Sequence, residues 1–130
     1  MWKVRAIRGA TTVSENTTEN IKQVVTELLD AIETSNQLDA EDIISVIFTA
    51  TKDLDAIYPA SVAREKSSWS NIPLLDVQQM FVEGSLEKCI RVLIYINTPK
   101  SQNAIQHVYL RQAQILRPDW NLAQMELQRG

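Results

Sequence analysis

The chain has 130 residues, of which 45% are hydrophobic and 22% are charged, and its formal net charge is −3 with a pI of about 5.1. This length suits one domain with a single core, and the composition is ordinary for a soluble globular protein. The acidic balance argues against nucleic acid as the main partner, because such binding needs a basic surface. No apolar run is long enough to cross a membrane, so no membrane partner is expected.

The chain contains one cysteine, Cys89, and one histidine, His107. They allow neither an internal disulfide nor a closed four-ligand zinc site, and we expect no metal or cofactor. Charges interrupt the apolar residues of the first eight positions, which is unlike a signal peptide. A cytoplasmic location is the expectation.

The first strand is indicated by alternating apolar and basic residues at positions 2–7, and Gly9 ends it before a polar loop at 11–16. A second apolar, β-branched run at 43–50 predicts a strand buried on both faces. A helix between them would make a βαβ unit, in which the two strands run parallel.

A long helix is the clearest element in the sequence. Thr17 or Thr18 can cap its start, and the segment 35–37 ends it. Its apolar residues follow the helical spacing: Ile21, Val24, Val25, Leu28, Leu29 and Ile32.

The second half predicts shorter elements, with a proline well placed to start a short helix. In chain order they are a helix starting at Pro59 with body 60–66, an extended segment at 72–77 with 81–82, a turn at 83–85, a strand at 89–97 antiparallel to the one before it, a short extended stretch at 105–109 and a helical turn at 110–116.

These elements predict an α+β fold: a mixed β-sheet with a long helix on one face, in the order β-α-β-α-β-β. One long and one short helix cannot cover both faces of such a sheet. A symmetric oligomer whose sheets pack together would cover the remaining face, and it would place pockets between subunits.

Arg91 lies within the apolar strand predicted at 89–97, where a guanidinium that stays charged needs an anionic partner. That partner is either an ion pair, including one across a subunit interface, or the anion of a ligand. Three further arginines lie in ordered-looking segments, and a small multiply charged anion would suit the set: Arg8, Arg64 and Arg117.

Each of these three arginines also has a structural explanation. Arg8 could be a solvated strand end or could pair with Glu15, Arg64 could pair with Asp55, and Arg117 could be a surface charge. No catalytic triad, phosphate-binding loop or zinc motif is present. His107 is more often a structural hydrogen bonder than a base, and Cys89 more often a small core residue than a nucleophile.

Five segments of the sequence resemble the small monofunctional chorismate mutases, the trimeric α/β class unrelated to the all-helical mutases. They follow one another in order with fitting spacing up to about residue 119: 5–13 (RAIRGATTV), 50–60 (ATKDLDAIYPA), 88–92 (KCIRV), 107–110 (HVYL) and 116–119 (LRPD).

The resemblance implies a homotrimer with three active sites at subunit interfaces and with sheets packed into a central pseudo-barrel. It implies a mutase domain at 1–118 and a tail at 119–130, with Arg117 in the mobile end that closes over the ligand. The implied reaction is a Claisen rearrangement of chorismate to prephenate, in the shikimate pathway of aromatic amino acid biosynthesis, without a cofactor.

The resemblance also implies roles for individual residues. Arg91 donates to the ether oxygen, where negative charge develops, and to a substrate carboxylate. Arg8 and Tyr109 hold carboxylate oxygens, and Tyr58 replaces a phenylalanine near the ring. The other implied substrate-binding residues are Arg64 and Arg117 at the mouth, with Leu75 and Leu116.

The sequence departs from this family at two positions. Gln79 stands where a glutamate commonly accepts the ring hydroxyl, and Asp76 stands where a cysteine is common. Our hypothesis is that Asp76 supplies the missing carboxylate while Gln79 keeps the hydroxyl contact. Strict strand alternation places residues three apart on opposite faces, so both could reach one pocket only with an irregular backbone.

Two other functions fit the anion-binding pattern. A non-catalytic trimeric sensor of a chorismate-like dicarboxylate is favoured by the uncharged Gln79. A trimeric deaminase of similar subunit architecture would also use an arginine for a carboxylate, but the ordered motifs around Arg8, Arg91 and Tyr109 argue against it.

Overall fold

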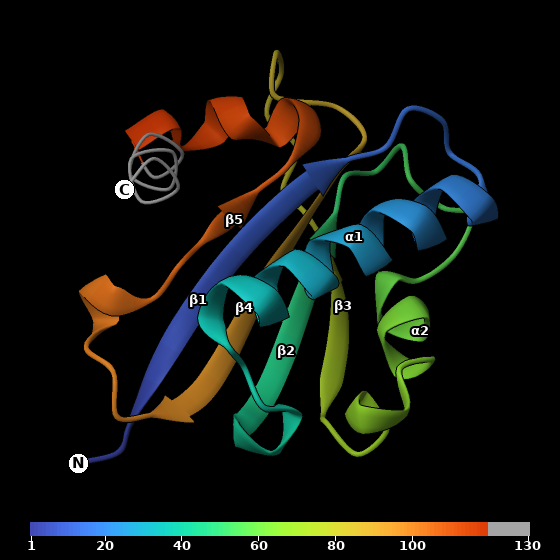
Figure 1. Ribbon diagram of the computed structural model, residues 1–130. Helices are drawn as coiled ribbons and strands as arrows, with labels where there is room; N and C mark the ends of the chain where they lie inside the picture. Colours follow the sequence, from blue (N-terminus) through green and yellow to red (C-terminus); the bar gives the residue numbers. More distant parts are fainter. Residues whose placement is uncertain (120–130) are drawn as a thin grey trace.

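The computed structural model describes residues 1–119, and they form one sheet with helices on one side (Figure 1). In chain order the elements are β1 (Lys3–Thr12), α1 (Thr18–Asn36), η1 (Ala40–Asp42), β2 (Ile43–Ala50), α2 (Pro59–Arg64), η2 (Ser67–Trp69), β3 (Leu74–Gln78), β4 (Cys89–Thr98), η3 (Gln102–Ala104), β5 (Val108–Tyr109) and η4 (Arg111–Leu116), where η marks a 3-10 helix.

The sheet is mixed, and its strand order is β3-β2-β4-β1-β5. Strand β4 runs antiparallel to both β1 and β2, whereas β2 pairs with β3 and β1 pairs with β5 in parallel. The predicted α+β class and the parallel direction of β1 and β2 are confirmed, but β4 lies between these two strands. The predicted order of four strands misses β5, a two-residue strand inside the expected extended stretch.

Helix α1 forms because its apolar residues fall on one side and its start is capped. The Thr17 side chain accepts a hydrogen bond from the Asn20 backbone N–H, and Gln37 ends the helix in the left-handed conformation. The six apolar residues that the periodicity selected are all buried against the sheet. The predicted helix and its limits are confirmed.

Gly9 allows α1 to pack closely on β1. A Cβ atom at this position would lie 2.9 Å from Ile32 Cδ1 and 3.1 Å from the Val108 carbonyl oxygen. Ile32 would have to shift and the Val108 backbone would have to give slightly, so glycine is the residue that keeps helix and sheet at this distance without adjustment. It does not end the strand, as the sequence suggested, because β1 continues to Thr12.

Two predicted boundaries differ from the structure. The residues Thr11 and Thr12, expected in a loop, extend β1 because they pair with Ile90 and Cys89 of β4. The pair 81–82, expected to be extended, forms no strand and is exposed, since β2 ends at Ala50 and offers no further partner beyond it.

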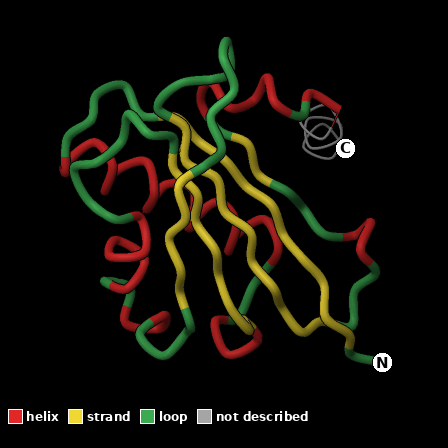
Figure 2. Tube along the Cα trace, turned by 180° about the vertical axis from the view of Figure 1, so that it is seen from behind, coloured by secondary structure: helices red, strands yellow, loops and turns green. Residues whose placement is uncertain are grey.

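The two faces of the sheet have different surroundings. Helices α1 and α2 cover one face, whereas the view from behind shows the strands uncovered (Figures 1 and 2). On β2, Val46 and Phe48 are buried toward the helices, but Ile44 is 39% exposed. The prediction that this strand is buried on both faces is therefore wrong for a single subunit, because no element of the described chain covers the second face.

Within residues 1–119, no helix has both the length and the apolar character needed to cross a membrane.

Candidate active site

Arg91 lies on the uncovered face of the sheet, where it is half-buried at the middle strand. Its neighbours in register are Ala10 of β1 and Thr49 of β2. The Arg91 Nε and Thr49 Oγ1 atoms are buried, and neither has a hydrogen-bond partner among residues 1–119. Burial without partners is unfavourable for such groups, so this part of the face is suited to receiving the acceptor atoms of a ligand.

Tyr109 brings β5 into the same cluster. Burial raises the pKa of Tyr109, and the charges of Arg8, Arg117 and Arg91 act in the opposite direction. All three guanidinium groups therefore lie close enough to influence one phenol. The structure thus brings together four of the residues that the sequence assigned to anion binding, although β1, β4, β5 and the end of η4 supply them separately.

His107 supports this cluster through the backbone. The Arg8 N–H donates a 2.9 Å hydrogen bond to His107 Nδ1. Burial lowers the pKa of His107, and the charges of Arg117 and Arg8 lower it further, which keeps the accepting nitrogen unprotonated. The preference for a structural hydrogen-bonding role is confirmed.

Cys89 is a buried core residue, as predicted. Burial raises the pKa of Cys89, against the opposing effect of Arg91. A thiol that stays protonated is a poor nucleophile.

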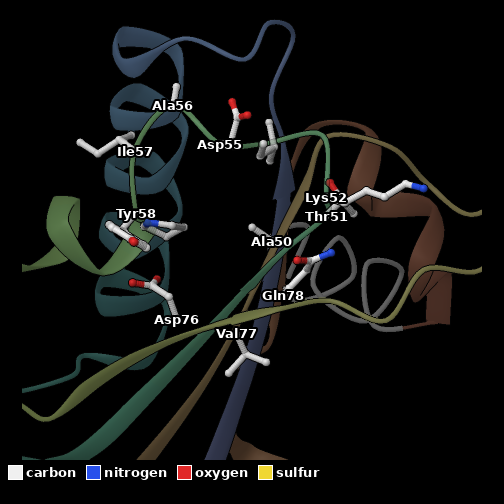
Figure 3. Close-up of a pocket in the computed structure, with 12 residues that line it drawn as sticks. Ala50, Thr51, Lys52, Asp55, Ala56, Ile57, Tyr58, Asp76, Val77 and Gln78 are labelled. Carbon is white, nitrogen blue, oxygen red and sulfur yellow. The ribbon is translucent and has the colours of Figure 1, made fainter.

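A pocket of about 560 Å³ opens beside β3, the edge strand opposite to β5 (Figure 3). Its wall combines the ends of β2 and β3 with the segment that leads into α2. Tyr58, 70% exposed, and Asp76 both line it. This pocket therefore contains two of the predicted site residues, but not Arg91, Arg8 or Tyr109.

Asp76 lies on the helix-covered side of β3, since it is in register with buried Phe48. Its Oδ1 accepts a 3.0 Å hydrogen bond from the Ala60 N–H, at the start of α2. Burial raises the pKa of Asp76, while that hydrogen bond and the charge of Arg64 counteract part of the effect. The carboxyl group thus fixes the pocket wall as well as adding charge to it.

Gln79 follows the last residue of β3, and its N–H donates to the Ala50 carbonyl oxygen at 2.9 Å. Its side-chain oxygen, Oε1, is buried and has no hydrogen-bond partner within the described part of the chain. Like Arg91 Nε, it is an unsatisfied polar atom that a ligand group could pair with. Leu75, also on β3, is 57% exposed on the uncovered face.

Of the structural explanations offered for the outer arginines, a solvated strand end fits Arg8, which is exposed, and a surface charge fits Arg117. Arg117 forms an ion pair with Asp119 at 3.0 Å. Asp55 instead accepts a hydrogen bond from Asn16, and neither Arg8 nor Arg64 forms an ion pair within residues 1–119. Both are exposed side chains whose charge is available to a ligand or a neighbouring subunit.

The predicted site residues thus form two groups on the sheet. The arginine group runs from the middle strand β4 to the edge strand β5 and comprises Arg8, Arg91, Tyr109, Leu116 and Arg117. The β3 group lies in or near the other edge strand and comprises Tyr58, Arg64, Leu75, Asp76 and Gln79, of which Tyr58 and Asp76 line the pocket. In one subunit they do not form a single enclosed site.

Two features near the site were not anticipated from the sequence. Thr49 lies beside Arg91. A polar residue in the largely apolar strand β2 was the feature of the sequence that could have pointed to it. Lys52 lines the pocket, and its Nζ lies 3.7 Å from the centre of the Phe81 ring. Its side chain extends away from Tyr58 and Asp76 (Figure 3), so it is not placed to add charge to that wall.

No group of three His, Cys, Asp or Glu side chains within residues 1–119 is arranged to hold a metal ion. The absence of a cofactor stays a prediction.

Fold and site together define an α+β protein that gathers arginines for a small anion without a nucleophile among them. Comparison with known proteins makes the class specific. The model of the family described as chorismate mutase type I matches residues 4–120. The chain therefore belongs to the type I chorismate mutases, the α/β class distinct from the helical mutases, and it is an isomerase of the intramolecular transferase kind.

Relatives from three organisms agree with this assignment. The chain is 44% identical to chorismate mutase AroH of Bacillus subtilis (strain 168), over 92% of this chain and 94% of the relative. It is 45% identical to chorismate mutase AroH of Thermus thermophilus, over 93% and 99%. A solved chorismate mutase from Clostridium thermocellum superposes with a TM-score of 0.81 at 49% identity, covering 85% of this chain and 97% of that one.

The resemblance read from the five sequence segments is confirmed, with its place in aromatic amino acid biosynthesis. The family match and the two AroH relatives favour the mutase over the two alternatives, a deaminase and a non-catalytic sensor.

Proposed function

We propose that this protein rearranges chorismate to prephenate at a site that two neighbouring subunits complete. The observation that carries the proposal is the cluster of Arg8, Arg91 and Arg117 around Tyr109, which has positive charge and hydrogen-bond donors but no nucleophile. An intramolecular rearrangement of a dicarboxylate needs this combination, because it requires shape and fixed charge only.

Arg91 is the proposed catalytic residue. Negative charge develops on the ether oxygen as the carbon–oxygen bond breaks ahead of carbon–carbon bond formation. A guanidinium held at the middle strand donates to that oxygen without having to reorganise, since its Nε is already buried and has no hydrogen-bond partner within residues 1–119. Arg8 and Tyr109 hold the carboxylates, with Arg117 and Leu116 closing one side.

A ring of subunits is the proposed assembly. Since the arginine group reaches the β5 edge and the β3 group lies at the other edge, a neighbour that sets its β5 edge beside the β3 edge would join the arginine group of one chain to the β3 group of the next. Contacts between unlike edges close into rings, and the family resemblance favours three subunits. Exposed apolar residues on the uncovered face are consistent with sheets that pack together: Val4, Ile44, Leu75 and Val77.

Asp76 and Gln79 are the proposed replacements for the family's glutamate. Gln79 offers its buried Oε1 to the ring hydroxyl, and Asp76 supplies the negative charge on the pocket wall. Tyr58 and Leu75 then contact the ring, and Arg64 stands at the mouth. Charge at Asp76 is partly balanced by Arg64, which limits how much it can favour positive character on the ring.

The test is a single preparation examined in two ways. Loss of chorismate absorbance in the ultraviolet is followed against the spontaneous rate, and light scattering gives the subunit count at the same protein concentration. We expect rapid loss of absorbance from a trimer. A folded protein without turnover would refute the proposed reaction, and a fully active monomer would refute the shared site. The cytoplasmic location expected from the sequence stays part of this proposal.

A further inference from the structure

Arg111 stands at the junction between β5 and η4, in a backbone conformation that side chains other than glycine rarely adopt. Its φ angle is +53°, in the left-handed region. The chain turns sharply here, so that Tyr109 lies two residues before the turn and η4 follows it toward Leu116 and Arg117. A residue held in this conformation needs contacts that over-determine it.

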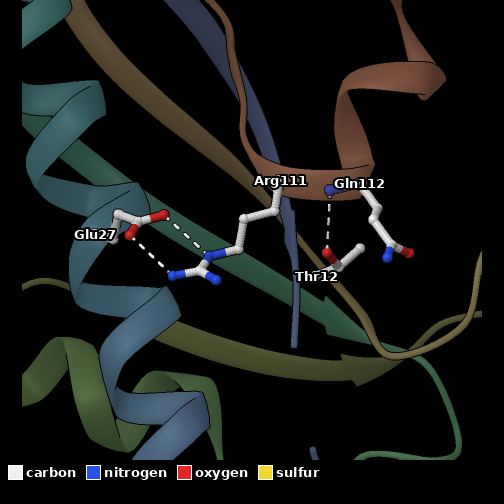
Figure 4. A network of polar contacts seen from close by, with 4 residues as sticks. All are labelled: Thr12, Glu27, Arg111 and Gln112. Carbon is white, nitrogen blue, oxygen red and sulfur yellow. Dashed lines mark hydrogen bonds and ion pairs between the residues drawn. The ribbon is translucent and has the colours of Figure 1, made fainter. Parts of the chain in front are cut away.

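The Arg111 side chain supplies one such contact, a two-pronged ion pair with Glu27 on the outer side of α1 (Figure 4). Its Nε donates to Glu27 Oε1 at 3.2 Å, and a terminal nitrogen donates to Oε2 at 3.1 Å. This parallel geometry fixes the guanidinium in orientation as well as in distance. The two residues are 84 positions apart in the chain.

The backbone beside Arg111 is fastened to β1. The Gln112 N–H donates to Thr12 Oγ1 at 3.2 Å, as Figure 4 also shows, and the Leu110 N–H donates to the Ala10 carbonyl oxygen at 2.9 Å. These bonds hold the turn against the sheet but leave its angle toward α1 open. The Glu27 contact sets that angle.

The segment so fastened carries part of the arginine group. Ala113 packs with Ala10 and Tyr109 in a small buried cluster, and Leu116 packs against it. The start of η4 therefore determines where Leu116 and Arg117 lie relative to the Tyr109 hydroxyl. A change in the angle of η4 would move these groups, while Arg91 on β4 would stay in place.

We propose that Glu27 and Arg111 are a positioning pair for the active site: their ion pair sets the angle at which η4 leaves β5, and thereby the placement of Leu116 and Arg117 relative to Tyr109 around a substrate carboxylate. This proposal rests on the proposed function. Neither residue touches the substrate.

The pair is expected to act on substrate binding more than on the chemical step. Carboxylate contacts from Tyr109 and Arg117 are made in the ground state and the transition state alike, and losing such uniform binding raises KM without lowering kcat. The donor to the ether oxygen, Arg91, lies outside the fastened segment. A role confined to stability would instead lower the melting temperature and leave KM unchanged.

Two variants test the pair from its two ends. Glu27→Gln keeps the size of the side chain but removes its charge. Arg111→Gly removes the side chain while adopting the left-handed conformation at no steric cost. Each is expected to raise KM about threefold, the scale of an exposed ion pair, with kcat within a factor of two and the melting temperature within a few degrees. Glu65→Gln, which removes an ion pair with Lys22 remote from η4, is the matched control and should leave KM unchanged.

The double variant shows whether the two residues act through each other. If they do, Glu27→Gln combined with Arg111→Gly raises KM no further than either change alone. Wild-type KM in both single variants would overturn the proposal, as would additive effects in the double variant. Should wild type itself lack turnover, the proposed function fails instead, so the two failures are distinguishable.

Discussion

The two faces of the sheet are made from the same strands and serve different purposes. On β4, Ile90, Val92, Ile94 and Ile96 point to the helices and are almost completely buried. The residues between them, Arg91 above all, point to the uncovered face, where Arg91 Nε and Thr49 Oγ1 are buried without a hydrogen-bond partner in the described part of the chain. Because side chains alternate between the two faces of a strand, neighbouring residues of β4 belong in turn to the packed core and to the candidate site.

This difference means that substitutions one position apart should have unlike consequences. On the helix face, a truncation removes packed apolar volume and should lower the free energy of unfolding. On the uncovered face, removal of a charge that forms no ion pair within residues 1–119 should cost activity while the fold is kept. The predictions below test that separation, beginning with the largest effect.

The largest expected effect is on the helix face, at Phe48, which is fully buried. Phe48→Ala should lower the free energy of unfolding by about 3–5 kcal/mol, because it removes the ring and leaves a cavity under α1 and α2. Urea denaturation at a fixed protein concentration measures this. Val82→Ala, at an exposed position outside the strands, is the control and should change it by far less. Equal losses in the two variants would contradict the division between faces.

The next effect is on the uncovered face, at Arg91. Arg91→Ala should lower kcat/KM by about 100- to 1000-fold, since it removes the proposed donor to the developing oxyanion. Its free energy of unfolding should stay the same or rise, because a half-buried charge that forms no ion pair among residues 1–119 is lost. Arg91→Lys keeps the charge without the planar donor and should recover only a small part of the activity. A decrease in kcat/KM of less than tenfold in Arg91→Ala would contradict the proposal that Arg91 is the catalytic donor.

A smaller effect is expected at Asp76, in the edge strand β3. Asp76→Asn keeps an oxygen for the Ala60 N–H but removes the charge, and it should lower kcat/KM roughly five- to tenfold. Adding Gln79→Glu to this variant should restore activity if negative charge is what the pocket needs. Unchanged kcat/KM in Asp76→Asn would leave Asp76 only its structural bond to α2.

The sequence predicted the parts of this molecule that depend on local pattern. Helix α1 and strand β2 follow directly from apolar spacing, capping and β-branched residues, and both were located to within about a residue. The place of β4 between β1 and β2 could not be read in this way, because strand order is set by contacts between residues far apart in the chain. The same limit hid the partner of Arg111, since Glu27 is 84 positions away.

For the site, residue types were more informative than positions. Arg91 was found from the cost of placing a charge in an apolar strand, and the structure shows that charge among polar atoms without partners. Asp76 and Arg91 were expected in one pocket, but register places them on opposite faces of the sheet in one subunit. The rule of alternation contained this information, and in the proposed ring a neighbouring subunit brings the two together.

The smallest expected effect concerns His107, whose Nδ1 accepts a hydrogen bond from the Arg8 backbone N–H. Because its pKa in the folded protein lies below the ordinary value of 6.5, the unfolded chain binds a proton that the folded chain excludes. The free energy of unfolding should therefore be constant well above that pH and should decline as the pH falls through it, since Arg8 and Arg117 oppose the added charge. His107→Asn, whose amide oxygen can accept from the Arg8 N–H, should show a shallower decline when urea midpoints at about pH 7.5 and about pH 5.5 are compared. An equally steep decline in both proteins would assign the pH dependence to other groups and leave His107 as a hydrogen-bond acceptor alone.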